Sequence, residues 1–233
     1  MFNIAPISYS CYKVNSFPKI SKNPIQLSSP TMLSYEFEED PESSIKLSDY
    51  HYEDYRIYDI HHEMVVHSNG KVFGKVFTKY NERFNFKSYM THDSDVLFMR
   101  IGKHIANDFI EKCNVEVDDL EDFDCDRMSV DFHQVKYKMR TITGAWFGKM
   151  KTDFVKSSAY FGRKVDASHL FEDAEKTGEI SMLIFEYIFK GETIKVGVTK
   201  DAAIVIYNKI PDQKLELMLV EQIFTNFVLP CIV

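Results

Sequence analysis

The sequence predicts an α+β protein, with mainly antiparallel sheet, helices on one side of it, and a C-terminal unit of three strands and a helix. Two observations support this class. Residues 180–207 contain three β-like runs joined by short linkers, and residues 211–229 then change to the periodicity of an amphipathic helix. Residues 55–113 show the same order of strands followed by a helix, without a detectable sequence repeat.

The first part of the chain is rich in proline. Five of the seven prolines lie within the first 41 residues, among many Ser and Asn, and no periodicity persists there. We expect residues 1–50 to form an extended arm. The arm either packs as an irregular strap on the protein or embraces a partner or a second protomer.

A β-hairpin is expected around Asn69-Gly70, because a type I′ turn needs positive φ at both central residues. A two-residue loop there would place Val66 opposite Phe73. Residues 84–90 would add a third strand.

The helix that follows is expected to be capped by Asp93-Ser94-Asp95 and to end near Cys113. The hairpin, the third strand and this helix together form an expected region from residue 51 to residue 113. Gly102 interrupts this pattern. Val96 to Ile101 is therefore also compatible with a strand.

The sign of charge changes near the middle of the chain. Seven of the eleven residues in 116–126 are Asp or Glu, whereas residues 127–164 contain nine Lys and Arg and two Asp. We expect a boundary within 114–127, with 114–233 as a mixed region that ends in the strand–helix unit. Residues 51–233 could also be one continuous domain.

In this second part, residues 128–141 have a β-like pattern and 167–176 resemble a short helix. Residues 180–189 are apolar on both faces, as a central strand requires, whereas 193–199 have one apolar face. Pro211 and Asp212 suit the start of the last helix and Pro230 its end.

Composition indicates a globular protein. The chain has 233 residues, 45% of them hydrophobic and 27% charged, and a net charge of −7, which argues against a general nucleic-acid or membrane coat. We expect a cytoplasmic protein, because no apolar run approaches a membrane span and the amino terminus does not resemble a signal peptide. The four scattered cysteines are expected to be reduced thiols.

One stretch carries residues that could catalyse a reaction. An acidic residue such as Asp124, followed by Asp131, Gln134 and Lys136 on a strand, resembles the acid…(Asp/Glu/Gln)-x-Lys pattern of the restriction-type nuclease superfamily. The resemblance implies carboxylates that bind Mg²⁺ and a lysine that stabilises a reacting oxygen. The alternative interpretation is a solvated acidic loop that leads into a sheet strand.

The basic stretch at 136–164 interleaves cations with aromatic residues. Such a pattern suits phosphate contacts and base stacking, although it also occurs where aromatics are the buried half of amphipathic elements. The candidates for binding nucleic acid or another partner are Lys138, Arg140, Trp146, Lys149, Lys151, Arg163 and Lys164.

His61, Glu63 and His67 would share one face of a strand, a spacing found in metal sites on sheets. Exposed histidines near a hairpin are the simpler interpretation. We therefore expect no bound metal or other cofactor unless the nuclease alternative, with Mg²⁺, holds.

Phosphate-loop, nucleophile-elbow and HExxH motifs are absent from the sequence. The main hypothesis is a non-enzymatic cytoplasmic protein that binds another macromolecule, in a phage or mobile-element defence or anti-defence setting. Another protein is the expected partner, nucleic acid could bind the 136–164 stretch, a homo-oligomer is compatible with the sequence, and no membrane contact is expected.

Overall fold

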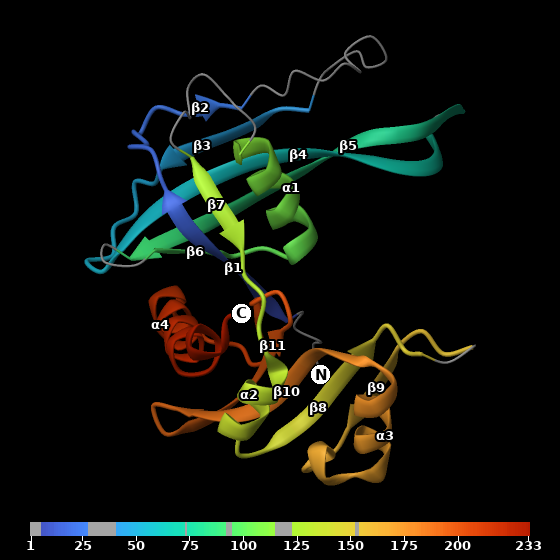
Figure 1. Cartoon of the computed structure of the whole chain (residues 1–233). Coiled ribbons are helices and arrows are strands. Elements are labelled where there is room, and N and C mark those ends of the chain that lie inside the picture. Colours follow the sequence, from blue (N-terminus) through green and yellow to red (C-terminus); the bar gives the residue numbers. More distant parts are fainter. Residues whose placement is uncertain (1–5, 28–40, 73, 92–94, 115–122, 152–153) are drawn as a thin grey trace. The chain divides into compact units, whose positions relative to one another are not determined.

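The computed structural model describes residues 6–27, 41–72, 74–91, 95–114, 123–151 and 154–233 (Figure 1). The chain divides into two compact units. The first unit comprises Met1–Cys11 and Arg127–Val233, and the second comprises Tyr12–Asp126.

The described strands form a 12-stranded antiparallel sheet, so the predicted α+β class is confirmed. The order is β2-β3-β4-β5-β6-β1-β12-β11-β10-β8-β9, and β7 also pairs with β1. The strands are β1 (Ile7–Ser16), β2 (Ile25–Gln26), β3 (Ser43–Leu47), β4 (Tyr55–Val72), β5 (Lys75–Thr91), β6 (Val96–Met99), β7 (Asp124–Arg127), β8 (Ile142–Gly148), β9 (Ser158–Phe161), β10 (Glu179–Phe189), β11 (Glu192–Thr199) and β12 (Ile204–Ile206).

Four α-helices accompany the described strands, and a π-helical and a 3-10 segment continue the last of them. No helix among the described residues is long and apolar enough to cross a membrane. The helical elements are α1 (Lys103–Asn114), α2 (Phe132–Lys138), η2 (Val165–Ala167), α3 (His169–Thr177), α4 (Gln213–Ile223), η3 (Phe224–Val228) and η4 (Leu229–Cys231).

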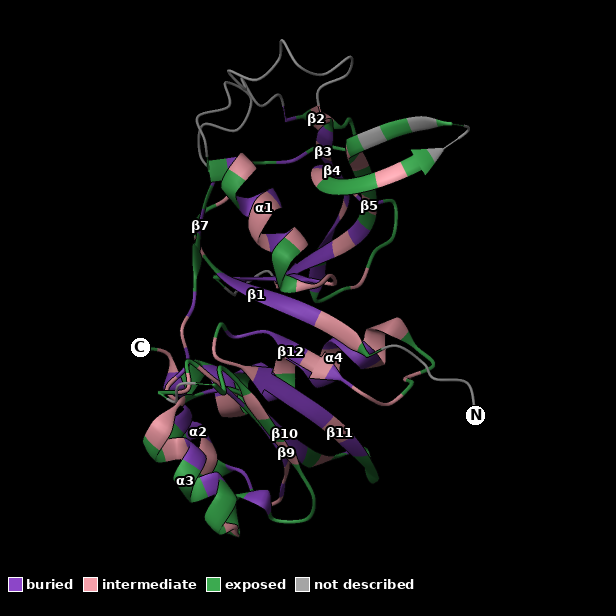
Figure 2. Ribbon diagram, turned by 90° about the vertical axis from the view of Figure 1, so that its right-hand side faces the viewer, coloured by how far each residue is buried: buried purple, intermediate pink, exposed green. Residues whose placement is uncertain are grey.

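The C-terminal unit has the predicted order, with β10–β12 followed by α4. β10 lies between β11 and β8, the central position that its two apolar faces predicted. Its residues Leu183 and Phe185 are buried, and Figure 2 shows the neighbouring β11 buried along much of its length. Phe185 contacts Phe227 of η3 at a ring-centroid distance of 5.0 Å, which packs the helical segment on this sheet.

The short linker expected between these two strands is a two-residue hairpin turn. Phe189 pairs with Glu192, and the two residues between them, Lys190 and Gly191, have φ of 50° and 85°. Positive φ at both central positions is the geometry of a type I′ turn, whose twist matches that of the flanking strands.

α4 starts close to its predicted beginning at Pro211-Asp212 but ends differently. The Asp212 side chain accepts a hydrogen bond from the Leu215 backbone N–H, as an N-cap residue does. The predicted stop at Pro230 is wrong, because the α-helix gives way to π-helical geometry at Phe224 and Pro230 lies within a 3-10 turn. A buried hydrogen bond of 2.6 Å from the Tyr9 hydroxyl to Glu216 joins β1 to this helix.

In the second unit, α1 packs on the sheet through its buried side chains, including Phe109 and Ile110. Val96–Met99 is the strand β6, so the expected helix from Asp95 is wrong and the strand alternative is correct for this segment. The helix starts only after Gly102, whose poor helix propensity separates the two elements. The proposed cap residues Asp93 and Ser94 lie outside the described residues.

The β4–β5 hairpin is longer than expected, and its predicted register is wrong. Val66 pairs with Tyr80, and the strands close at Val72 and Lys75, where Gly74 has φ of 82°. Asn69-Gly70 lies inside the ladder, where a register shift absorbs it as an irregularity. The predicted third strand, 84–90, is part of β5, and much of the outer hairpin is exposed (Figure 2).

Residues 128–141 were expected to be a strand, which is also wrong, because Phe132–Lys138 form the helix α2. Asp131 is its N-cap and accepts from the His133 N–H at 2.9 Å. Phe132 and Val135 are buried and lie three positions apart, about one helical turn. This helical spacing was present in the sequence together with the apparent alternation of polar and apolar residues.

The described part of residues 1–50 contributes β1, β2 and β3 to the sheet. β1 belongs to both units, and its middle residues, Tyr9 to Tyr12, are buried. The four cysteines are free thiols, and all are buried. Burial raises the pKa of Cys125 to about 12, followed in size by the effect of the adjacent Asp124 and Asp126 carboxylates.

Candidate nucleic-acid interface

The alternation of β8 sends its two large aromatic residues to opposite faces of the sheet. Ala145 and Phe147 are buried, and the Phe147 ring contacts Phe171 of α3 at 5.2 Å. Trp146 lies between them in sequence and is 46% exposed. Because successive side chains of a strand point to opposite faces, Trp146 stands on the face away from α3.

Phe161 of β9 lies beside Trp146 on this outer face. It pairs with Gly144, and its Cδ1 atom lies 3.0 Å from where a Gly144 Cβ would be, so the ring covers the glycine. Phe161 is nevertheless 60% exposed, and its ring is nearly perpendicular to that of Trp146 at a centroid distance of 6.1 Å. One side of the Phe161 ring therefore packs on the backbone of Gly144, and the other side is open to a ligand.

The same face continues across the next strands. Met182 pairs with Trp146, and its methyl group fills the space above Gly197. Beyond it lies Tyr207, with the Lys195 ammonium 5.7 Å from its ring centroid. Burial raises the pKa of the Tyr207 hydroxyl above its usual value, so the hydroxyl is even less prone to ionise than an exposed tyrosine. We call these side chains the platform: Trp146, Phe161, Met182 and Tyr207.

Exposed cations flank both ends of the β8–β9 pair. At one end, a hydrogen bond of 3.1 Å from the Gly162 N–H to the Thr143 carbonyl brings the chain after β9 beside the start of β8. The other end is the loop between the strands. β8 has seven residues, so the two ends lie about 20 Å apart. The exposed cations are Arg140, Arg163 and Lys164 at the first end and Lys149, Lys151 and Lys156 at the second.

One carboxylate partly offsets the second group. Glu179 contacts Lys149 at 3.1 Å and Lys200 at 2.6 Å. These two lysines, with Lys200 contributing most, hold the pKa of Glu179 below its usual value. Two cations thus share one anion, and a positive charge remains beside the platform. The last predicted cation, Lys138, is exposed at the end of α2.

The residues of the nuclease alternative do not share a strand face. Gln134 and Lys136 lie on α2, where positions two apart point in different directions. Gln134 donates to Asp131 at 3.0 Å, and Lys136 donates to Glu175 at 2.6 Å. Asp124 lies in the other unit, where Asn15 contacts it at 3.2 Å. The rest of the acidic run, residues 116–122, lies outside the described residues.

His61 and Glu63 do share one face, with 3.7 Å between Nε2 and Oε1. Burial opposes ionisation of Glu63, but the Glu42 N–H and the Arg83 side chain, which donates at 2.6 Å, hold its pKa below the usual value. The Glu63 oxygen that faces His61 is therefore already bound by Arg83. Across the part of the chain that the structure describes, no group of three or more His, Cys, Asp and Glu could hold a metal ion.

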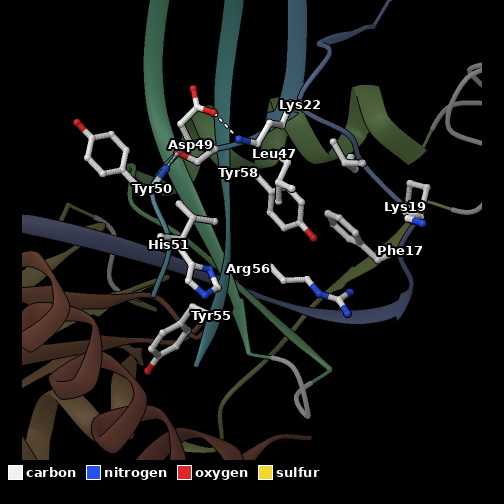
Figure 3. Close-up of a pocket in the computed structure, with 14 residues that line it drawn as sticks. Phe17, Lys19, Lys22, Leu47, Asp49, Tyr50, His51, Tyr55, Arg56 and Tyr58 are labelled. Carbon is white, nitrogen blue, oxygen red and sulfur yellow. Dashed lines mark hydrogen bonds and ion pairs between the residues drawn. The ribbon is translucent and has the colours of Figure 1, made fainter. Parts of the chain in front are cut away.

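Two features of the molecule were not predicted from the sequence. The first is the extension of the platform to Met182 and Tyr207, for which the strand glycines Gly144 and Gly197 were a usable indication, since glycine within a strand marks close approach of another group. The second is a pocket of about 700 Å³ in the other unit (Figure 3). It is built from residues 17–20, Lys22, 47–51 and 55–58, none of which carries a recognisable motif.

Comparison of the sequence with models of known protein families found no match, and comparison with curated proteins found none either. The geometry of the molecule itself is therefore the basis for a functional proposal.

Proposed function

We propose that this protein acts by binding another macromolecule, and that the platform binds single-stranded nucleic acid. The observation that carries the proposal is the exposed pair Trp146 and Phe161, which lies between two groups of cations at the ends of β8 and β9. Proteins that bind single strands combine these two elements, because bases stack on aromatic rings while cations contact the phosphates.

The arrangement suits a single strand better than a duplex. A base can reach the open side of Phe161 only when it is unstacked from its neighbours, as it is in a single strand. The two cationic ends lie about 20 Å apart, a span that several successive phosphates can bridge. Aromatic rings stack on the face of any base and do not recognise the hydrogen-bonding groups at its edge. We therefore expect little sequence preference.

The test is fluorescence anisotropy of end-labelled oligo(dT) and oligo(U), each of about 12 nucleotides, titrated with the full chain. We expect saturable binding that weakens as salt increases, because phosphate contacts release counterions. Phe161→Ala should weaken binding about 10-fold, since stacking on one aromatic residue contributes about 1–3 kcal/mol.

Leu170→Ala is the matched control, because Leu170 is also a large exposed apolar residue but lies on α3. It should bind both oligonucleotides like the unmodified protein. Absence of binding, or equal binding by Phe161→Ala, would reject the nucleic-acid proposal. A stoichiometric protein captured by the unmodified chain and lost with Phe161→Ala would instead identify the platform as a protein-binding surface.

A further inference from the structure

The second unit contains a pocket of about 700 Å³, within the range of small-molecule sites. Its walls come from the segment after β1, the loop after β3 and the start of β4 (Figure 3). We propose that this pocket binds a small planar anion, namely an aromatic ring system that carries a phosphate or carboxylate group. This site is separate from the platform and does not depend on the function proposed for it.

The apolar part of the pocket is fixed by packing. Phe17 contacts Tyr58 and Phe123, each with a ring-centroid distance of 5.1 Å. Tyr58, Ile20 and Ile57 are almost fully buried, so they support the floor rather than move into solvent. Because these side chains are already held in place, the wall is preformed. The flat ring of a ligand can pack on it without first ordering the side chains of the pocket.

The polar part of the pocket is positively charged. Lys22 is paired with Asp49 at 2.8 Å, and this contact holds the pKa of Asp49 below its usual value. Among the described residues, Arg56 and Lys19 have no carboxylate within 4.0 Å. Two lining cations thus remain uncompensated in a chain whose net charge is −7. This excess favours an anion over a neutral or cationic ring.

Arg56 is placed to make the main contact. In Figure 3 its side chain extends along the pocket beside Phe17 and Tyr58, so a ring packed on the aromatic floor could bring its anionic group to the guanidinium. Arg56 also interacts with the Tyr58 hydroxyl, where it partly opposes the rise that burial causes in the Tyr58 pKa. A planar guanidinium can donate two parallel hydrogen bonds to a carboxylate or a phosphate.

Isothermal titration of the full chain with two pairs of probes tests the proposal. 5′-AMP and adenosine form the phosphate pair, and 2-naphthoate and 2-naphthamide form the carboxylate pair. At least one anion should bind saturably, with its uncharged counterpart about 10-fold weaker or more, because a hydrogen bond to a charged group contributes about 1.5–3 kcal/mol. Which pair responds distinguishes a phosphate from a carboxylate ligand.

Arg56→Gln should weaken binding of the responding anion about 10- to 100-fold. The matched control is Lys13→Gln, which removes an exposed cation of β1 that does not line the pocket and should leave binding unchanged. Phe161→Ala should also have no effect, which separates this site from the platform. Failure of both anions to bind, equal binding of an uncharged counterpart, or unchanged binding by Arg56→Gln would overturn the proposal.

Discussion

His62 of β4 is fully buried and contacts side chains of two other elements, β3 and α1. Its Nδ1 atom lies 2.8 Å from the Ser43 Oγ of β3, and its ring meets Phe109 edge to face at 5.5 Å. Its Nε2 atom lies 3.1 Å from the Asp108 carboxylate, an ion-pair distance, although the two atoms are not aligned as a full hydrogen bond. The three side chains couple two strands to the helix.

Lys112 completes this group by donating to the Glu63 carbonyl at 2.9 Å, and burial lowers the pKa of its ammonium. Serine, histidine and aspartate are also the residue types of a hydrolytic triad. Here Ser43 is only 1% exposed, so its hydroxyl is not presented to a substrate. A structural role accounts for the arrangement, since polar contacts among buried side chains fix how elements pack.

The His62 imidazole holds the pKa of Asp108 below its usual value, so the Asp108 carboxylate should stabilise the fold. Asp108→Asn should lower the free energy of unfolding by about 1 kcal/mol at pH 7, a value that allows for the partial exposure of the carboxylate. Because the pKa of Asp108 is lower in the folded state, its carboxylate stabilises the fold fully at pH values above its unfolded-state pKa of about 3.9. This stabilisation is lost as the pH falls through the lower pKa of the folded state. The difference should therefore shrink below about pH 4.

Urea denaturation of both proteins as a function of pH measures this effect. Asp173→Asn is a control, because Asp173 forms an exposed pair with Lys176 that should contribute little. A difference for Asp108→Asn that stays constant down to about pH 3 would show that the carboxylate charge is not what stabilises the contact.

At the scale of single elements, the two hairpins show what local sequence determines. Lys190-Gly191 forms its turn because Phe189 and Glu192 on either side pair in register. Asn69-Gly70 has the stronger turn composition, yet β4 and β5 continue past it and close at Gly74. Pairing along two long strands outweighs the preference of one dipeptide, and a register shift accommodates it.

Gly191→Ala tests the turn, because an L-residue at φ of 85° is strained. We expect a loss of about 1–2 kcal/mol in the free energy of unfolding, measured by urea denaturation. Gly148→Ala, at a glycine of β8 with open space around its Cβ position, should change stability by less than about 0.5 kcal/mol. Equal effects of the two substitutions would contradict the turn assignment.

The C-terminal strands and helix could be predicted because their periodicities are long and their turns are local. α2 could not, since Asp131 to Lys138 read as alternating polar and apolar residues, and only the buried Phe132 and Val135 show the helical spacing. That error also produced the apparent strand motif of Gln134 and Lys136. The candidate site was only partly visible in the sequence, because Trp146 meets Met182 through a ladder between distant strands.

At the scale of the whole molecule, the net charge of −7 does not describe the surface that we assign to binding. The cations of residues 140–164 gather at the two ends of β8 and β9, while the acidic run precedes them in the chain. A local positive surface attracts a polyanion, whereas the rest of an anionic protein repels it. Binding should consequently be confined to the platform.

Trp146 allows this central claim to be tested directly, because it is the only tryptophan of the chain and is 46% exposed. Unlabelled oligo(dT) of about 12 nucleotides should quench its fluorescence saturably, and added salt should reverse the quenching. Phe161→Ala should need about 10-fold more oligonucleotide for the same effect. Tryptophan emission that stays unchanged while the oligonucleotide binds would place the nucleic acid elsewhere and contradict the account.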